Sequence, residues 1–176
     1  MKAIFLDRDG VLNEAIIRDG KPYPPKTLAE FVIKKDAEIV LKKMKQEGFL
    51  LFVVTNQPDI ARGTTSSTTV DALNQELQKA LSIDDIFVCP HDDCNHCQCR
   101  KPQAGLLFQA RDRYDVDLQK SFMIGDRWRD IEAGESAGCK TIWLDFGYNE
   151  KKPEKCDCVC TSLTEALNFI RGDKDE

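Results

Sequence analysis

The 176-residue chain has no apolar run near the roughly 20 residues that a membrane-spanning helix needs. Its N-terminal apolar stretch is too short for a signal peptide and lacks a small-residue cleavage site. An excess of positive charge is also missing, since 25 Lys and Arg stand against 30 Asp and Glu, a net charge of −5. These absences argue against a membrane protein and a nucleic-acid-binding surface. We therefore expect a cytoplasmic protein that binds neither membrane nor nucleic acid.

Internal repeats, low-complexity segments and composition shifts that mark a domain boundary are missing too. Hydrophobic residues make up 41% and charged residues 31% of the chain, as in ordinary globular proteins. The length is sufficient for one domain with a normal core. We expect a single monomeric domain over residues 1–171, followed by a flexible tail at residues 172–176.

Short apolar runs alternate with helical patterns along the chain. Six runs are typical of buried parallel strands and cover residues 3–7, 50–55, 86–89, 122–124, 141–144 and 158–160. Apolar residues at helical spacing predict four helices, at residues 37–44, 70–81, 106–114 and 163–170. This alternation predicts an α/β fold, a doubly wound, Rossmann-like parallel sheet with helices on both faces. Residues 19–25, with three prolines, are either a surface loop that closes over a substrate or a plain connector.

Two carboxylates, Asp7 and Asp9, lie two residues apart where the first predicted strand ends. Like charges this close repel, and each raises the pKa of the other unless a cation lies between them. A hard divalent cation, Mg²⁺, removes that cost; one carboxylate can then attack phosphorus while the other transfers a proton. Alternatively, both residues only form a turn, because Asp-Gly is a common turn sequence.

Polar side chains also follow the second and third strands. Thr55, Asn56 and Gln57 carry a hydroxyl and amides suited to hydrogen-bond phosphate oxygens, although the same residues suit an ordinary turn. Arg100 and Lys101 come just before a predicted helix. A lysine there neutralises an anionic nucleophile and its phosphate, and an arginine binds substrate oxygens with its fork. A solvated basic pair is the alternative.

The fourth strand is followed by Gly125 and two acids. Asp126 is placed to complete the oxygen shell of a metal ion, and Asp130 to orient that ligand. Acids near the start of a helix are otherwise helix caps. Ligands of parallel sheets bind outside the carboxyl ends of the strands, so we expect all these residues to converge at one edge.

In this order, the residues resemble the haloacid dehalogenase superfamily of phosphatases, and the resemblance runs from Ala3 to about Leu167. Within it, the chain is most similar to the small phosphatases that act on heptose 1,7-bisphosphate or on histidinol phosphate. The shared motifs are Asp7-Arg8-Asp9-Gly10, Thr55-Asn56-Gln57, Ile60-Ala61-Arg62-Gly63, Cys89-Pro90-His91, Cys99-Arg100-Lys101-Pro102 and Gly125-Asp126. The gaps after Asp9 and Thr55 leave no room for a large cap domain.

The resemblance implies a role for each residue. Asp7 is the expected nucleophile, Asp9 the general acid and base, and Thr55 and Lys101 stabilise the transferring phosphoryl group. Mg²⁺ is expected on Asp7, the backbone carbonyl of Asp9 and Asp126. The residues expected to bind substrate are Asn56, Arg100 and Arg127.

The implied reaction removes the phosphate at position 7 of a heptose 1,7-bisphosphate through an aspartyl-phosphate intermediate. Histidinol phosphate or another small sugar phosphate is the alternative substrate, because the short span from His91 to Cys97 is closer to the histidinol-phosphate enzymes. Two other functions compete with this one. A non-catalytic zinc-loop interaction module has no need of the catalytic side chains, and a nucleic-acid 3′-phosphatase conflicts with the charge of −5.

Residues 89–99 contain six potential soft or borderline metal ligands. Sulfur and imidazole suit a closed tetrahedral zinc site, which is structural and would fix the neighbouring Arg100 and Lys101. The residues alone leave Cys94 and His96 as possible ligands. The resemblance implies the set Cys89, His91, Cys97 and Cys99. A second group, Cys156, Cys158 and Cys160, alternates as on one face of a strand and forms either a thiol metal site or small buried hydrophobes.

Overall fold

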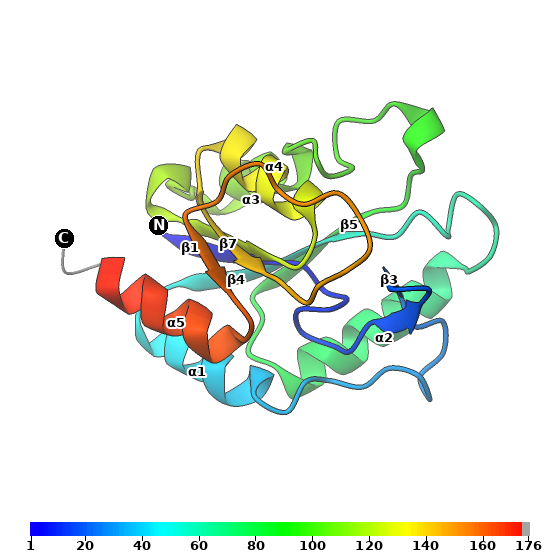
Figure 1. Cartoon of the computed structure of the whole chain (residues 1–176), viewed down its shortest axis with the longest axis horizontal. Helices are drawn as coiled ribbons and strands as arrows, with labels where there is room; N and C mark the ends of the chain where they lie inside the picture. Colours follow the sequence, from blue (N-terminus) through cyan, green and yellow to red (C-terminus); the bar gives the residue numbers. More distant parts are fainter. Residues whose placement is uncertain (174–176) are drawn as a thin grey trace.

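The computed structural model describes residues 1–173, and its main feature is a parallel sheet between two layers of helices (Figure 1). The strand order is β5-β4-β1-β6-β7-β8. The strand bounds are β1 Ala3–Leu6, β4 Leu50–Asn56, β5 Asp85–Cys89, β6 Phe122–Gly125, β7 Lys140–Leu144 and β8 Cys158–Cys160. The predicted doubly wound sheet is therefore confirmed. Since β1 lies between the two halves of the sheet, its carboxyl end is at the topological switch point.

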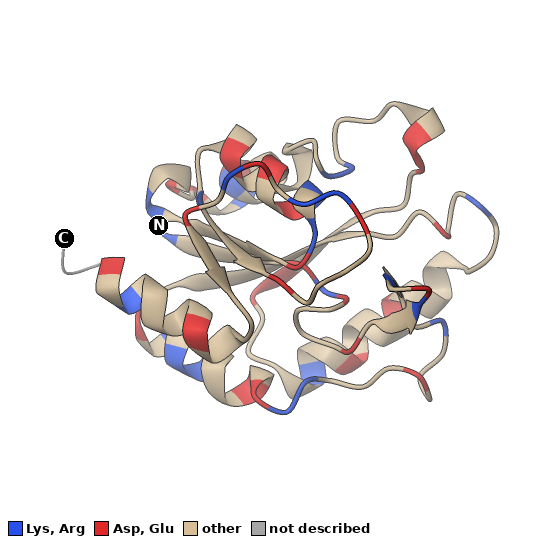
Figure 2. Cartoon of the chain, viewed as in Figure 1, with Lys and Arg blue, Asp and Glu red and all other residues tan. Residues whose placement is uncertain are grey.

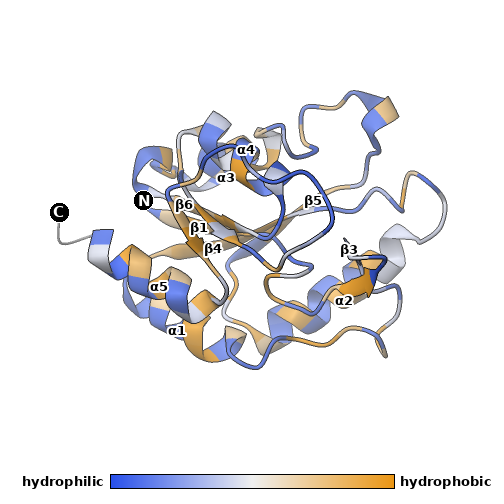
Figure 3. Cartoon of the chain, in the orientation of Figure 1, coloured by the Kyte–Doolittle hydropathy of each residue, from blue (hydrophilic) through white to orange (hydrophobic). Residues whose placement is uncertain are grey.

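Five α-helices cover the sheet within residues 1–173. Their bounds are α1 Ala37–Gln46, α2 Ser67–Ala80, α3 Gly105–Tyr114, α4 Trp128–Ala137 and α5 Leu163–Gly172. Alternate residues of β1 serve opposite faces: Ile4 and Leu6 pack in the core under α1 and α5, whereas Phe5 packs in the core under α3 and α4. Figure 3 shows the apolar sheet enclosed by helices whose outer surfaces are hydrophilic. Both cores are thus built by the predicted apolar spacing.

Helix α4 is absent from the four helices that apolar spacing predicts. Its interior contains Gly134, which ordinarily weakens a helix. Here the glycine permits close packing, because a Cβ at this position would lie 2.6 Å from the Cβ of Met123 on β6. Helix–sheet contact therefore outweighs the low helix propensity at this point.

Residues 19–25, expected to form a surface loop or a connector, are partly regular. Residues 19–23 belong to an antiparallel hairpin of β2 Ile16–Arg18 and β3 Lys21–Tyr23, and Pro24 and Pro25 follow it without regular structure. Asp19 and Gly20 form its turn with positive φ angles of 51° and 72°, the backbone that a two-residue type I′ turn requires. Pro22 fits because both strands of this isolated hairpin are edges. The Asp-Gly pair correctly indicates a hairpin turn, whereas the three prolines wrongly favoured a segment without strands.

The C-terminal end of the chain is helical as far as the structure describes it. Helix α5 continues to Gly172, and Asp173 forms an ion pair with Lys140, so ordered structure extends into the predicted tail. Residues 174–176 of that tail lie outside the described residues. In the part that is described, we find no helix with both the length and the apolar character to cross a membrane.

Candidate active site

Asp7 lies at the carboxyl end of β1, against the ammonium group of Lys101. The Nζ atom of Lys101 is 2.9 Å from Asp7 Oδ1 and 2.6 Å from Asp130 Oδ1. The lysine side chain is 1% exposed, and Figure 2 shows acidic residues where the central strands end. Residues predicted at three different strand ends thus meet in one buried cluster.

The cluster has more negative than positive charge. Burial raises the pKa of Asp7 to about 7; Asp130 adds to the rise, whereas Lys101 opposes it. Burial likewise raises the pKa of Asp126 well above its usual range, with further contributions from Asp7 and Asp130. Burial opposes the charged form of Lys101, but attraction to Asp130 and Asp7 still raises its pKa. Three carboxylates share one ammonium, and a bound cation would offset the excess.

Asp126 follows β6 and presents one oxygen that has no partner. Its Oδ2 accepts a hydrogen bond from the Tyr148 hydroxyl at 2.7 Å, whereas Oδ1 is buried without a hydrogen bond. Gly10, at a φ of 88°, approaches so closely that a Cβ would overlap the Asp126 carboxylate. Oxygens of Asp7, Asp126 and Asp130 lie within 4.8 Å of one another. A group of this kind has the donor atoms for a hard divalent cation.

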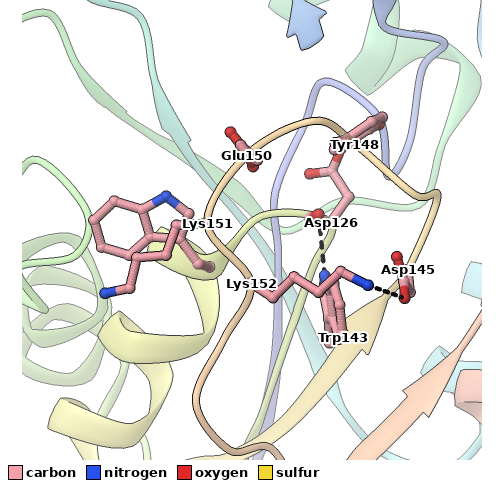
Figure 4. Close-up of a pocket in the computed structure, with 8 residues that line it drawn as sticks. Asp126, Trp143, Asp145, Tyr148, Glu150, Lys151 and Lys152 are labelled. Atoms are coloured by element: carbon pink, nitrogen blue, oxygen red, sulfur yellow. Dashed lines mark hydrogen bonds and ion pairs between the residues drawn. The ribbon is translucent and has the colours of Figure 1, made fainter. Parts of the chain in front are cut away.

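Tyr148 is a residue of the site that the sequence did not reveal. It lies in the loop after β7, and Figure 4 shows it beside Asp126 together with Trp143. Burial and the charge of Asp126 raise the pKa of the Tyr148 hydroxyl, so it remains a donor. No local pattern could identify this tyrosine, because 22 residues separate it from its partner.

Asp9 is fixed by side chains from three parts of the chain. Asn13 Nδ2 donates to its Oδ1 at 2.9 Å, and Gln57 Nε2 donates to its Oδ2 at 2.8 Å. Arg8 contacts both oxygens at 3.1 to 3.2 Å, and this fully buried guanidinium donates to Asn74 of α2 at 2.9 Å. Asp9 itself remains 15% exposed. Gln57 was expected to contact phosphate, and the other three had no predicted role; together they orient a carboxylate that a substrate can reach.

The residues at the end of β4 support the cluster from the side. The buried Thr55 hydroxyl accepts from Gln57 Nε2 at 2.9 Å. Asn56 forms two hydrogen bonds with the backbone of Lys101, both 3.0 Å long, one as donor and one as acceptor. The Asn56 amide therefore holds Lys101 in place, and its contact with substrate stays a prediction.

Four side chains of the cysteine loop, residues 89–99, also converge. Cys99 Sγ is 3.1 Å from Cys89 Sγ and 3.5 Å from Cys97 Sγ, and His91 Nδ1 is 3.3 Å from Cys99 Sγ. A tetrahedron with zinc about 2.3 Å from each sulfur has edges of about 3.8 Å. The observed separations are close to this value, so the four ligand atoms surround a position of the size of one metal ion.

Two alternative ligands from the sequence lie outside this group. Cys94 is exposed on the short 3₁₀-helix Asp93–Asn95, and His96 ends that helix. Burial opposes ionisation of Cys97, but hydrogen bonds from the Arg100 backbone and from Cys99 lower its pKa to about 6. A thiolate that forms near neutral pH is suited to bind metal.

The acids of the cysteine loop hold arginines at the rim of the site. Asp92 accepts from Arg62 Nε and Nη2 at 2.6 and 2.8 Å, and these bonds lower the pKa of Asp92 to about 2. Asp93 Oδ1 accepts from Arg100 Nε at 2.8 Å and lies 3.4 Å from Arg129 Nη1. Arg129 is a further residue that the sequence analysis did not identify.

Arg127 immediately precedes α4, and its side chain forms an ion pair with Glu150, with a shortest distance of 2.6 Å. Its backbone N–H donates to Asp130 Oδ2 at 3.0 Å, which helps to fix that carboxylate. The predicted contact between Arg127 and substrate is not tested by these interactions and stays a prediction.

The cysteines on and beside β8 do not form a third group of candidate metal ligands within residues 1–173. Cys160 is buried, and Cys156 and Cys158 are partly buried on and beside β8. Within residues 1–173, only the three-carboxylate cluster and the cysteine loop bring together three or more candidate ligands. The choice between a packing role and a thiol metal site for Cys156, Cys158 and Cys160 stays a prediction.

Comparisons with known proteins agree with this geometry. Residues 98–166 match the HAD-hydrolase-like family model. The D-glycero-alpha-D-manno-heptose-1,7-bisphosphate 7-phosphatases of Photorhabdus laumondii and Campylobacter jejuni are 36% and 37% identical, with 97% of this chain and 97% and 96% of those chains covered. The D-glycero-beta-D-manno-heptose-1,7-bisphosphate 7-phosphatase of Haemophilus ducreyi is 33% identical, with 96% and 98% covered.

A solved structure shares the whole architecture. It is the D,D-heptose 1,7-bisphosphate phosphatase from B. bronchiseptica, complexed with magnesium and phosphate. The TM-score is 0.80 at 29% identity, and the alignment covers 98% of this chain and 99% of that chain. The chain therefore belongs to the haloacid dehalogenase-like hydrolases, in the family of the D-glycero-D-manno-heptose 1,7-bisphosphate 7-phosphatases.

Proposed function

We propose that the protein removes the 7-phosphate of D-glycero-D-manno-heptose 1,7-bisphosphate in a reaction that requires Mg²⁺. The names of relatives that align with nearly the whole chain support this substrate. The observation that carries the chemistry is the buried pair of Asp7 and Lys101, 2.9 Å apart. A fixed ammonium beside a carboxylate nucleophile lowers the repulsion that an incoming phosphate would otherwise meet.

The three-carboxylate cluster fits Mg²⁺. Asp7, the backbone carbonyl of Asp9 and Asp126 would hold the ion, and the unpartnered Asp126 Oδ1 favours this assignment. Oxygen ligands suit Mg²⁺, and the relative from B. bronchiseptica was solved with magnesium and phosphate. When bound, the ion polarises phosphate oxygens and offsets the excess negative charge. Asp130 is already engaged by Lys101.

The chain's own residues account for two chemical steps. Asp7 attacks phosphorus to form an aspartyl phosphate, and Asp9 donates a proton to the departing sugar oxygen. Asp9, now a base, takes a proton from the water that hydrolyses the intermediate. Lys101 and the Thr55 hydroxyl stabilise the transferring phosphoryl group in both steps.

The cysteine loop fits a closed zinc site formed by Cys89, His91, Cys97 and Cys99. Four protein ligands leave no open position, so the zinc would be structural and would fix the residues that follow Cys99.

Free thiols persist in reducing compartments, which supports a cytoplasmic location.

Phosphate release from a substrate panel tests this function. The panel contains both anomers of the heptose 1,7-bisphosphate, because relatives with either name match this chain. It also contains histidinol phosphate, fructose 1,6-bisphosphate and a 3′-phosphorylated oligonucleotide, each with and without Mg²⁺. We expect a heptose bisphosphate to give the highest kcat/KM. A higher value for histidinol phosphate would overturn the proposed substrate, and no release from any compound would favour the non-catalytic interaction module.

Tyr148→Phe is expected to raise the Mg²⁺ concentration for half-maximal activity by about tenfold, with kcat at saturating Mg²⁺ changed less than about twofold. The variant loses the 2.7 Å hydrogen bond that orients Asp126, and such outer contacts tune metal affinity. The measurement is a Mg²⁺ titration of activity. Tyr114→Phe is the matched control, since the Tyr114 hydroxyl, at the end of α3, donates to Asp85 of β5 at 2.9 Å, away from the cluster. An unchanged Mg²⁺ requirement in Tyr148→Phe would show that Tyr148 does not position the ligand.

A further inference from the structure

Three guanidinium groups gather at the rim of the site, beside the backbone of Lys101. Arg100 directly precedes that lysine, and Arg129 Nη1 lies 3.5 Å from the Lys101 carbonyl oxygen. The positive charge of Arg127, which precedes Arg129 by two residues, contributes to lowering the pKa of Arg129. Lys101 therefore links the carboxylates to the arginines: its ammonium group contacts Asp7, and its carbonyl oxygen lies beside the Arg129 guanidinium.

The counter-charges of these arginines are incomplete. Glu150 pairs with Arg127, and Asp93 pairs with both Arg100 and Arg129. Asp92 approaches Arg100 only to 4.0 Å, and its short ion pair, 2.6 Å long, is with Arg62. Burial lowers the pKa of Arg129, and the charges of Arg100 and Arg127 lower it further, although Asp93 opposes this. The three cations thus have two carboxylates at close range, because Asp92 is held by Arg62, and this favours an anionic ligand.

Asp93 is the weakest member of this arrangement. Its side chain is 61% exposed, and its oxygens lie 3.4 and 3.5 Å from the Arg129 guanidinium, longer than a good charge-assisted hydrogen bond. The Arg129 side chain is 24% exposed, so solvent and ligands can reach it. A phosphate has more oxygens and more charge than a carboxylate and can accept from two guanidinium groups at once.

We propose that Arg129, together with Arg100, binds the second phosphate of the substrate, the one that is not cleaved, and that this phosphate displaces Asp93. The inference rests on the proposed function, since it assumes a bisphosphate at the site. It adds a residue that sets specificity for bisphosphates over monophosphates. Asp93 occupies the anion position only while the site is empty.

The test compares heptose 1,7-bisphosphate with heptose 7-phosphate, which lacks the second phosphate. In Arg129→Gln, the ratio of the KM for the bisphosphate to the KM for the monophosphate is expected to rise about tenfold, because one charge-assisted contact is lost. Arg129→Lys should restore part of the ratio, since it keeps the cation without the fork. Arg113→Gln is the control, as Arg113 pairs with Asp85 on the outside of α3 at 2.8 Å.

Asp93→Asn separates binding from a structural role. Displacement predicts that this variant lowers the KM for the bisphosphate, because the arginines are freed of their competitor. If Asp93 and Arg129 only pin the cysteine loop, both variants raise the two KM values equally and lower the thermal midpoint, and the inference is wrong. An unchanged KM ratio in Arg129→Gln, with both compounds hydrolysed, also overturns it. Failure of the wild type to hydrolyse either compound would instead overturn the proposed function.

Discussion

Asp7→Asn is expected to reduce phosphate release by about 10⁴-fold or more. The amide cannot attack phosphorus, and no aspartyl phosphate can form, so loss of the nucleophile removes the first step rather than slowing it. Asp7 lies at the end of the central strand, where its backbone N–H donates to the Ile124 carbonyl at 3.0 Å. That hydrogen bond is independent of the side chain, so the fold should be retained. Initial rates at saturating Mg²⁺ and heptose bisphosphate measure the effect.

Asp71→Asn is the matched control for this substitution. Asp71 is an exposed residue of α2. Its substitution removes one negative charge, as Asp7→Asn does, but away from the cluster. We expect this control variant to hydrolyse the substrate at the wild-type rate. Circular dichroism and the thermal midpoint establish that the Asp7 variant is folded. A folded Asp7→Asn protein with full activity would eliminate the aspartyl-phosphate mechanism.

The same variant is expected to be more stable than the wild type at pH 7 in buffer to which no Mg²⁺ is added, without a chelator that would also remove zinc. The folded-state pKa of Asp7 is raised from 3.8 to about 7, so the folded protein binds more protons than the unfolded chain between these values. Wild-type stability therefore falls as pH rises through this window, and Asn lacks that cost.

Thermal unfolding at pH 4, 5, 6 and 7 measures this difference. The midpoint of Asp7→Asn should exceed that of the wild type by at least about 2 °C at pH 7, and the gap should close near pH 4. Saturating Mg²⁺ should stabilise the wild type more than the variant, because the variant has lost a charged ligand. A gap that is independent of pH would show that the Asp7 carboxylate is not destabilising in the metal-free protein.

The residues that sequence analysis located best are those whose position depends on topology alone. Asp7, Lys101 and Asp126 follow strands of a parallel sheet, and such strand ends necessarily meet at one edge. Once the alternation of strands and helices was clear, the convergence of these three residues followed from it. Their distances and the charge imbalance did not follow, because these depend on side-chain packing.

Other residues escaped prediction because their roles depend on contacts between distant segments. Asn74 supports Arg8 across 66 positions, and Tyr148 reaches Asp126 from a loop with no regular pattern. The role proposed for Arg129 depends on its position beside Arg100 and on Asp93, with which both arginines form ion pairs. The hairpin turn at Asp19 and Gly20 is different. Its Asp-Gly sequence is a local turn signal, but the prolines that follow it favoured a loop over a hairpin in the sequence analysis.

Cys99→Ser is expected to reduce bound zinc from about one ion per chain to near zero and to lower activity by about 100-fold. Cys99 Sγ lies within 3.5 Å of the other three ligand atoms, so its loss opens the tetrahedron on the side of Arg100 and Lys101. Misplacement of a catalytic cation by about 1 Å is sufficient for an effect of this size. Metal analysis of the purified protein and initial rates provide the two measurements.

Stability should fall together with activity, because binding of a structural metal contributes directly to the free energy of folding. We expect the thermal midpoint of Cys99→Ser to drop by about 10 °C, which corresponds to about 3 kcal/mol for a domain of this size. Cys94→Ser is the matched control: it removes a thiol from the same loop, but that thiol is exposed and outside the ligand group. Loss of zinc from the Cys94 variant, or its retention by the Cys99 variant, would show that the ligand set is wrong. Retained zinc with normal activity in Cys94→Ser, beside loss of both in Cys99→Ser, would support a structural metal that holds Lys101 against Asp7.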